Sequence, residues 1–333
     1  MGGGSRRWRD AMQMALYGPD GFFVSGAGPA AHFRTSVHAS ATFAAALLRL
    51  VKSVDTALGH PDPFHLVDVG AGRAELLLAV DALVDEPLRR RMRLTAVELA
   101  PRPADLPDRI GWLPRPPAGV TGLLLATEWL DNVAVDVVQD DRYVLVEPST
   151  GEETPGGTVD ADDADWLARW WPYARRAEVG RSRDRAWAEA VGTLARGLAL
   201  AVDYGHLRID RPADGTLAGF RYGRQVPPVP DGSCDITAHV AMDSVAAAGA
   251  DAAGQSYALI SQRDALRAFG VAGRRPPLTL ASTDPTGYVR ALTAASTAAE
   301  LTDPAGLGGH WWLLQPVGLE NPAAASTAQS MTF

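Results

Sequence analysis

Short continuous apolar runs along the chain alternate with apolar positions at helical spacing. In the stretch from Phe64 to Leu78, the apolar run that ends at Val69 is broken by Gly70 and Gly72, and a helical pattern then begins. A strand, a tight glycine turn and a helix make up the opening βα unit of a nucleotide-binding α/β domain. Further apolar runs predict strands at 94–97, 110–112, 122–126, 198–202, 257–260 and 311–315.

Helical spacing between these runs predicts helices at 6–16, 40–54, 166–171, 185–198, 240–250 and 262–269. Residues 135–146 alternate and turn at Asp140–Asp141, which predicts a hairpin. Residues 149–163 are polar, acidic and glycine-rich and predict a loop, and 215–239 are also expected to be rich in loops. Together, 135–195 form a predicted insertion between two strands of the sheet.

Composition and charge narrow the classes of function. The 333 residues are 47% hydrophobic and 21% charged, an ordinary globular balance. The net charge of −8 argues against nucleic acid as the main partner, since phosphate binding needs a basic face. It is compatible with a cationic cofactor or a basic peptide.

The same composition bears on compartment and on metal binding. The single cysteine, Cys234, excludes a disulfide within the chain and a cysteine-based zinc site. No apolar run reaches the length of a membrane span, and the N-terminus is too short and polar for a signal peptide. We therefore expect a cytoplasmic protein, and the scarcity of lysine beside abundant Ala, Gly, Arg and Asp indicates a GC-rich bacterial genome.

The residues of the glycine turn discriminate between two classes of nucleotide. A dinucleotide site carries G-x-G-x-x-G, but Glu75 stands at the third glycine position, where its carboxylate would repel a pyrophosphate. Asp68 lies near the end of the strand, and Glu98 ends the next strand, where a carboxylate accepts hydrogen bonds from ribose hydroxyls. This acidic set favours a cationic, phosphate-free nucleoside such as S-adenosyl-L-methionine (SAM) over NAD. The alternative is a plain βα turn beside an exposed Glu98.

Other polar residues are candidates for the acceptor site. Ligands of open α/β sheets bind outside the carboxyl ends of the strands, so Glu128 and Asp131 stand where a substrate meets the cofactor. Their alternative role is that of helix N-terminal carboxylates, which the helix dipole favours. Thr35 and Ser36 are either N-cap residues or hydroxyls of a segment that folds over the cofactor. His239, in a predicted loop, fits a surface role better than a ligand role.

Several separated motifs, in this order, resemble the MidA-type SAM-dependent methyltransferase family, which includes the mitochondrial complex I assembly factor 7, a protein-arginine methyltransferase. The resemblance runs from about Leu16 to Gln315. The motifs that carry it are Leu16–Phe23, Phe33–Ser36 with Ser40, Asp68–Gly72, Ala96–Glu98, Thr127–Asp131, Val202–Gly205, Gly215–Leu217 and Asp235–Val240.

The resemblance implies a class I methyltransferase fold. This fold is α/β and Rossmann-like, with a mostly parallel seven-stranded sheet whose last strand is antiparallel, and with inserted segments that cover the substrate. It divides the chain into a cofactor-covering segment at 1–55, a core at 56–134 and 196–318, the insertion at 135–195, and a disordered tail at 319–333.

The resemblance also implies roles for individual residues. Gly70 and Gly72 would pass under the methionine part of SAM, and Asp68 would orient the glycine loop or the SAM amine. Glu98 would hold the ribose. The full cofactor set implied by the resemblance is Thr35, Ser36, Asp68, Gly70, Gly72 and Glu98. No metal is expected.

For the acceptor, the resemblance implies that Glu128 and Asp131 face it. A guanidinium has a pKa above about 12 and arrives charged, so these carboxylates would fix its fork bidentately and localise a lone pair on the attacking nitrogen. Asp203 and His239 are further candidates for accepting the proton. A homodimer is left open, as is the role of the insertion as a lid or a dimer arm.

The chain departs from the family pattern at the acceptor motif. The family usually has Asn-Glu-Phe-Phe-Asp-Ala-Leu-Pro, of which Glu128 and Asp131 remain. The first acid of the glycine motif is usually Glu and here is Asp68, and a histidine usually found after Gly-Thr-Leu is here Gly223. We expect SAM binding to persist and a protein arginine to be the acceptor, with a subunit of respiratory complex I as one candidate. The alternatives are a small-molecule methyltransferase and a SAM-binding assembly factor without turnover.

Overall fold

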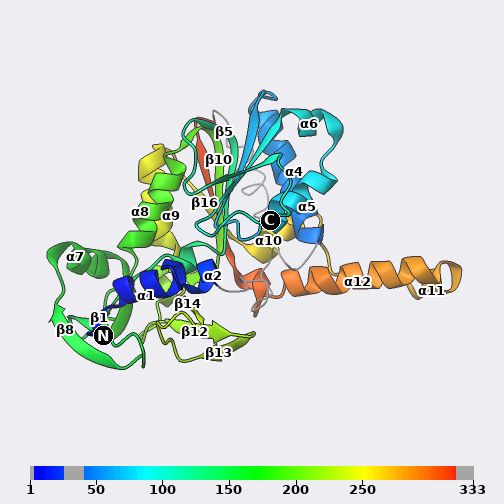
Figure 1. Ribbon diagram of the computed structural model, residues 1–333. Helices are drawn as coiled ribbons and strands as arrows, with labels where there is room; N and C mark the ends of the chain where they lie inside the picture. Colours follow the sequence, from blue (N-terminus) through cyan, green and yellow to red (C-terminus); the bar gives the residue numbers. More distant parts are fainter. Residues whose placement is uncertain (1–3, 26–40, 320–333) are drawn as a thin grey trace.

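A computed structural model describes residues 4–25 and 41–319, and its centre is a mixed β-sheet. The strands of this sheet are β2 (Phe64–Val69), β3 (Met92–Val97), β4 (Ile110–Leu113), β5 (Val120–Thr127), β10 (Leu194–Asp203), β16 (Ala258–Ser261) and β17 (Trp311–Val317). Their order is β16–β17–β10–β5–β2–β3–β4, and β17 runs antiparallel to both of its neighbours (Figure 1). The α/β fold and the predominantly parallel sheet were both predicted and are confirmed.

Helices cover both faces of this central sheet, because its strands are apolar on both faces. On one face, Leu66 and Leu125 pack in a cluster with α4 (Ala41–Ala57), α5 (Glu75–Leu83), α6 (Glu86–Arg91) and α10 (Gln262–Ala268). On the other face, Val67 and Leu124 pack with α8 (Arg181–Val191) and α9 (Met242–Ala253). Neighbouring residues thus enter opposite clusters, which explains the continuous apolar runs in the sequence.

A second sheet carries the N-terminal helix. Its strands are β1 (Arg6–Arg7), β6 (Asp136–Gln139), β7 (Arg142–Val146), β8 (Glu153–Thr158) and β9 (Arg176–Val179), and α7 (Ala161–Trp170) accompanies it. Helix α1 (Trp8–Tyr17) buries Trp8, Met12 and Leu16 in a cluster with Val137 and Val146 of this sheet. Helix α2 (Phe22–Ser25) follows α1. Because β1 pairs with β7, the start of the described chain is part of the same sheet as 136–179.

Three predicted segments differ from the structure. Residues 149–163, predicted as a loop, contain β8, a largely exposed strand that pairs with β7 and has a polar composition for that reason. The loop-rich stretch 215–239 contains a small antiparallel sheet of β12 (Ala218–Arg221), β13 (Arg224–Val226) and β14 (Asp235–Thr237). The helix predicted at 185–198 is α8, which ends at Val191, and β10 starts three residues later, at Leu194.

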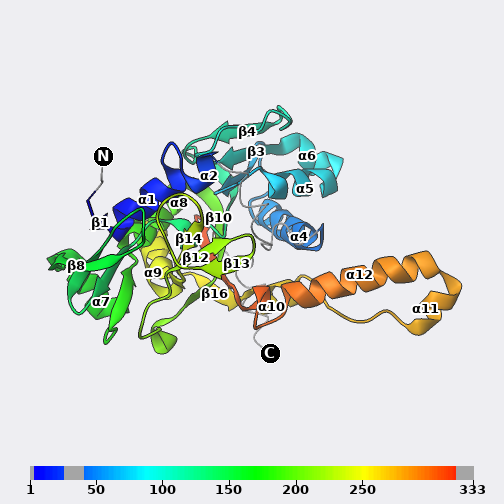
Figure 2. The ribbon, with the colours of Figure 1, turned by 60° about the horizontal axis from the view of Figure 1, so that its bottom comes forward.

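A helical arm, which was not predicted, extends from the body of the molecule. It consists of α11 (Leu278–Thr283) and α12 (Pro285–Leu301), and both ribbon views show it pointing away from the central sheet (Figures 1 and 2). Only Ala298 and Leu301 of α12 are buried, so its sequence has no apolar stripe from which a helix could be predicted. The remaining short elements are β11 (Gly205–His206), β15 (Val240–Ala241) and the 3-10 turns η2 (Leu130–Asn132), η3 (Arg208–Asp210) and η4 (Leu307–Gly309).

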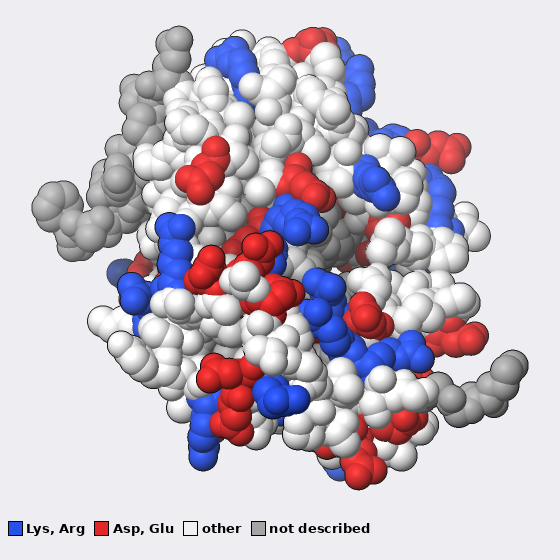
Figure 3. Space-filling model, turned by 90° about the vertical axis from the view of Figure 1, so that its left-hand side faces the viewer, with Lys and Arg blue, Asp and Glu red and all other residues white. Residues whose placement is uncertain are grey.

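The predicted division of the chain into a cofactor cover, a core, an insertion and a tail stays a prediction. Of the predicted tail, Leu319 is buried, and 320–333 lie outside the described residues. Within the described ranges, no helix is both long and apolar enough to cross a bilayer. The face shown in Figure 3 carries acidic and basic side chains interspersed rather than one continuous basic stripe.

Candidate functional site

One cavity of about 1000 Å³ lies at the carboxyl ends of β2, β3 and β5. In parallel α/β sheets this edge is where ligands bind. The cavity wall combines the glycine turn after β2, the end of β3, the segment after β5, and residues of α1, α2, α8 and β14. The lining residues used below are Tyr17, Phe23, Asp68, Gly70, Gly72, Glu75, Glu98, Glu128, Trp129, Asp131, Asn132, Ala134, Tyr204, Asp235 and Thr237.

The glycine turn needs its glycines for backbone conformation and for space. Gly70 has φ +72° and Gly72 has φ +55°, in the left-handed region that glycine adopts without strain. A Cβ on Gly70 would lie 2.8 Å from Cδ1 of Trp129, so that indole packs directly against the turn. The Gly72 amide donates a hydrogen bond of 3.1 Å to Glu98. The turn is therefore fixed on both sides by the cavity wall.

Glu98 organises the end of β3. Its carboxylate accepts hydrogen bonds from the backbone amides of Gly72 (3.1 Å), Leu99 (2.7 Å) and Ala100 (3.2 Å). All three donors are backbone amides, so no cationic side chain takes part in the hydrogen bonds that hold this carboxylate at the cavity wall. The carboxylate can accept hydrogen bonds from hydroxyl groups of a ligand in the same place.

Asp68 lies at the end of β2, in the part of the cavity that the glycine turn and Glu98 also line. Its side chain is buried, and one carboxylate oxygen, Oδ1, has no hydrogen-bond partner within the described residues. Burial, reinforced by the negative charges of Glu75 and Glu98, raises the pKa of Asp68 to about 8. A cationic ligand group would restore the ionised form, whereas a pyrophosphate would add to the repulsion.

Asp131 occupies the other half of the cavity. Its Oδ2 accepts hydrogen bonds from the hydroxyls of Tyr204 (2.5 Å) and Thr237 (2.7 Å), while its buried Oδ1 has no partner among the residues described. Burial and the charges of Asp131 and Asp203 raise the pKa of Tyr204 well above its ordinary value, so Tyr204 keeps its proton and acts as a donor. One oxygen of Asp131 is thus committed to the protein and the other is available to a ligand.

Glu128 stands beside Asp131 with an unusual backbone conformation, φ +50°. Its Oε1 lies 4.0 Å from Nδ1 of His310, which immediately precedes β17. Burial lowers the pKa of His310 to about 4, so the imidazole is neutral at pH 7. The ring that lies next to Glu128 on this side is therefore a neutral imidazole and not a cation.

A buried arginine holds the backbone around Asp131. Arg183 of α8 donates to the backbone carbonyls of Asp131 (2.6 Å), His239 (2.9 Å) and Val133 (3.2 Å). Burial lowers the pKa of its guanidinium, while the nearby carboxylate of Asp131 acts in the opposite direction. Arg183 thus joins the segment after β5 to the segment after β14 through the backbone.

Comparison with known proteins decides the family. A family model described as "Putative S-adenosyl-L-methionine-dependent methyltransferase" matches residues 44–260. The chain belongs to this family. The methyltransferase has SAM as its cofactor, and the glycine turn at the cavity wall, the Oδ1 of Asp68 without a partner in the described part of the chain, and the carboxylate of Glu98 fit a cationic nucleoside.

Solved structures agree with this assignment. A COG1565 superfamily member from Burkholderia thailandensis bound to S-adenosyl-homocysteine is 25% identical, with a TM-score of 0.77 over 96% of this chain and 89% of that chain. A native structure of a COG1565 superfamily protein from the same organism is 24% identical, with a TM-score of 0.77 over 97% of this chain and 90% of that chain, and supports the fold. No curated protein matches the chain in sequence.

The structure of the methyltransferase brings most of the sequence-predicted residues into one cavity. These are Asp68, Gly70, Gly72, Glu98, Glu128 and Asp131. Thr35 and Ser36 lie outside the described residues, so their predicted role stays a prediction.

The two reserve candidates for proton transfer have other contacts. The Asp203 carboxylate accepts the backbone amides of Leu130 (2.9 Å), Asp131 (3.3 Å) and Tyr204 (3.0 Å), which orders the segment after β5. His239 is exposed and is not among the residues that line the cavity, although its ring packs edge-on against Tyr204 at 5.1 Å between ring centres.

Sequence reasoning missed several polar residues that line the cavity, among them four that lie in the quoted motifs. Tyr17 reaches it from α1, Tyr204 from the end of β10, and Asp235 and Thr237 from β14. Asn132 holds Asp235 through a hydrogen bond of 2.8 Å. Of these four residues, only Tyr204 lies just beyond a predicted sheet strand, two residues after 198–202, and β14 was not predicted.

Proposed function

We propose that this methyltransferase transfers the methyl group of SAM to an arginine guanidinium of a protein. The observation that carries the proposal is the free Oδ1 of Asp131, buried in the same cavity as Asp68 and next to Glu128. We call the part of the cavity around Asp68, Gly70, Gly72 and Glu98 the cofactor half, and the part around Glu128 and Asp131 the acceptor half. The carboxylates of the acceptor half suit an acceptor that is itself cationic. A subunit of respiratory complex I is the candidate acceptor that the family resemblance suggests.

We propose that the cofactor half binds SAM through three features. Asp68 takes the ammonium group, Gly70 and Gly72 let the methionine part lie against the backbone, and Glu98 takes the ribose hydroxyls. Bound SAM supplies an electrophilic methyl group on a sulfonium. The role of the protein is to hold the acceptor nitrogen in line with that methyl group, and near-attack positioning can contribute roughly 7–11 kcal/mol.

At the acceptor half, Asp131 and Glu128 bind the guanidinium together. Because Oδ2 of Asp131 already accepts two hydroxyls, Asp131 offers a single oxygen and cannot take the guanidinium fork alone. The fork is therefore divided, with one N–H on Asp131 and another on Glu128. This differs from bidentate binding by each carboxylate, and it places Glu128, which lines the cavity with Asp131, to receive the proton that the methylated nitrogen loses.

A small-molecule acceptor is the second candidate. The cavity, at about 1000 Å³, is at the upper end of what small-molecule sites enclose, so it has room beside a bound cofactor. Its wall also carries the aromatic side chains of Trp129 and Phe220. In this alternative, SAM binds in the same way and only the methyl acceptor differs.

The test uses methyl-labelled SAM with a bacterial lysate and with purified arginine-containing peptides, followed by acid hydrolysis and separation of the amino acids. We expect labelled methylarginine from the wild type, none from Asp131→Asn, and SAM binding preserved in that variant. Label in small metabolites but in no protein favours the second candidate. SAM binding without any methylated product would leave a binding protein that acts in assembly.

A further inference from the structure

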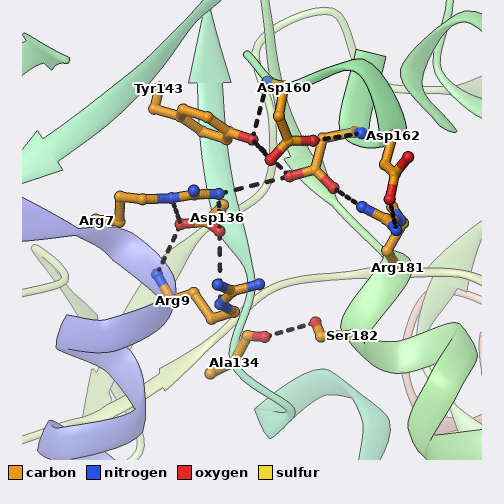
Figure 4. Close-up of polar contacts among 10 residues, drawn as sticks. Arg7, Arg9, Ala134, Asp136, Tyr143, Asp160, Asp162, Arg181 and Ser182 are labelled. Atoms are coloured by element: carbon orange, nitrogen blue, oxygen red, sulfur yellow. Dashed lines mark hydrogen bonds and ion pairs between the residues drawn. The ribbon is translucent and has the colours of Figure 1, made fainter. Parts of the chain in front are cut away.

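The first helix of the chain is fixed at its base by a nearly buried ion pair. Arg7, which directly precedes α1, donates from Nε to Oδ1 of Asp136 (3.0 Å) and from Nη2 to Oδ2 (2.5 Å), as Figure 4 shows. The guanidinium carbon lies 3.5 Å from the centre of the Tyr143 ring. Asp136 is 2% exposed and also accepts the backbone amide of Arg9 (3.3 Å). A forked pair over an aromatic ring is a geometry that lysine could not reproduce.

This pair continues into a network that reaches the cavity wall. The Tyr143 hydroxyl donates to Asp160 (2.7 Å) and Asp163 (2.8 Å), and Arg181 donates to the other oxygen of Asp163 (2.7 Å). The next residue, Ser182, donates to the carbonyl of Ala134 (2.6 Å), which lines the cavity (Figure 4). We call these side chains the anchor cluster, defined as Arg7, Asp136, Tyr143, Asp160, Asp163, Arg181 and Ser182.

From this base, α1 and α2 run over the cavity. The buried side of α1 packs on the second sheet through Trp8, Met12 and Leu16, and its C-terminal end delivers Tyr17 to the cavity. Phe23 of α2 also lines the cavity and stacks on Tyr17, with 5.5 Å between the ring centres.

Tyr17 is electrostatically coupled to both halves of the site. Burial raises the pKa of its phenol, and the charges of Glu98, at the cofactor half, and of Asp235 and Asp131, at the acceptor half, raise it further. An α1 displaced at its base would therefore alter the wall of both halves.

We propose that the anchor cluster is a positioning device for the cofactor, through which the second sheet holds α1 and α2 over the cavity. In this view, strands β6 to β9 support α1 and α2, and Arg7 and Asp136 are positioning residues that act through Tyr17 and Phe23. The proposal does not depend on the identity of the acceptor, because it concerns SAM binding alone.

The test is calorimetric titration with SAM of the wild type, Arg7→Met and Arg6→Met. Arg6 is the matched control, since it is the same residue type in the same two-residue strand and has no ion pair within the described residues. We expect Arg7→Met to weaken SAM binding roughly tenfold, which is within the range of couplings between linked sites, and Arg6→Met to change it less than twofold. Arg7→Lys, which keeps the charge and loses the fork, is expected to fall between the two.

Amide hydrogen exchange on the same proteins separates positioning from general destabilisation. We expect faster exchange in 8–17 of Arg7→Met with unchanged exchange in β2, and an intermediate effect in Arg7→Lys, which also serves if Arg7→Met does not fold. Faster exchange in α1 with unchanged SAM affinity in either variant would overturn the proposal, as would equal losses of affinity in the Arg7 and Arg6 variants.

Discussion

The pH dependence of SAM binding tests the protonation state assigned to Asp68. With a pKa raised to about 8 by burial and by the charges of Glu75 and Glu98, the carboxyl is mostly protonated in the ligand-free protein at pH 7. An ammonium group placed beside it favours the ionised form. Binding should therefore release a proton, and the affinity should rise with pH up to about 7.5, below the range in which the amino group of SAM loses its own proton.

The magnitude follows from the linkage between proton loss and binding. Each pH unit below 8 costs the complex about 1.36 kcal/mol, which is a factor of about ten in the dissociation constant. We expect the dissociation constant of SAM to be roughly 25-fold larger at pH 6 than at pH 7.5 if the complex holds Asp68 fully ionised. The substitution Asp68→Asn removes the titrating group, so its affinity should be flat over the same range.

Calorimetry at pH 6.5 in two buffers of different ionisation enthalpy counts the protons directly. At this pH the amino group of SAM stays protonated, because an α-amino group titrates at about 7.7–8.0. We expect close to one proton released by the wild type and none by Asp68→Asn. The control Asp108→Asn changes a fully exposed carboxyl that does not line the cavity and should behave as the wild type. A pH-independent affinity from 6 to 7.5 without proton release would show that Asp68 is already ionised and refute the reasoning.

Three further predictions concern the same cavity. Gly70→Ala places a Cβ 2.8 Å from the Trp129 indole at a positive φ, so we expect a stability loss of about 1–3 kcal/mol in urea unfolding and weaker SAM binding; an unchanged midpoint would contradict this. Asp68→Asn should stabilise the ligand-free protein increasingly from pH 4 to pH 8, by up to about 1.36 kcal/mol per unit, since the wild-type folded state alone must hold a proton there. Tyr204→Phe removes one donor to Asp131 and should lower methyl transfer roughly 10- to 100-fold, with SAM affinity unchanged in parallel titrations.

The central sheet could be predicted because both of its faces are covered. The run from Leu123 to Ala126 is continuous and apolar since alternate residues enter opposite helical layers, and the carboxyl ends of neighbouring parallel strands then meet at one edge. This geometry placed Asp68, Glu98 and Glu128 at that edge from sequence alone, and the cavity contains all three. Glycine spacing and the acidic character of the turn were enough to favour SAM over a dinucleotide.

The acceptor half could not be predicted to the same extent, because it depends on pairings between distant segments. Thr237, which donates to Asp131, lies on β14, a three-residue strand of a small sheet with no periodic pattern. Tyr17 arrives from α1, whose position is fixed by the Arg7–Asp136 pair across 129 residues of sequence. Neither contact has a local signal in the chain, and the exposed polar strand β8 has the composition of a loop.

Several residues that depart from the family acceptor motif make identifiable contacts in the structure. Trp129, where the family usually has Phe, packs against Gly70 and so touches the cofactor turn, and Leu130 is fully buried in the central core. Asn132, where the family usually has Ala, hydrogen-bonds Asp235. Of the substituted positions, only Leu130 is not among the residues that line the cavity, whereas Thr127, Trp129, Asn132, Val133 and Ala134 line it together with the retained Glu128 and Asp131. Oδ1 of Asp131 is buried without a partner among the described residues, which costs free energy in the ligand-free state, and a cationic ligand group would offset that cost. The proposal of a cationic acceptor therefore rests on this oxygen and not on the pattern of substitutions.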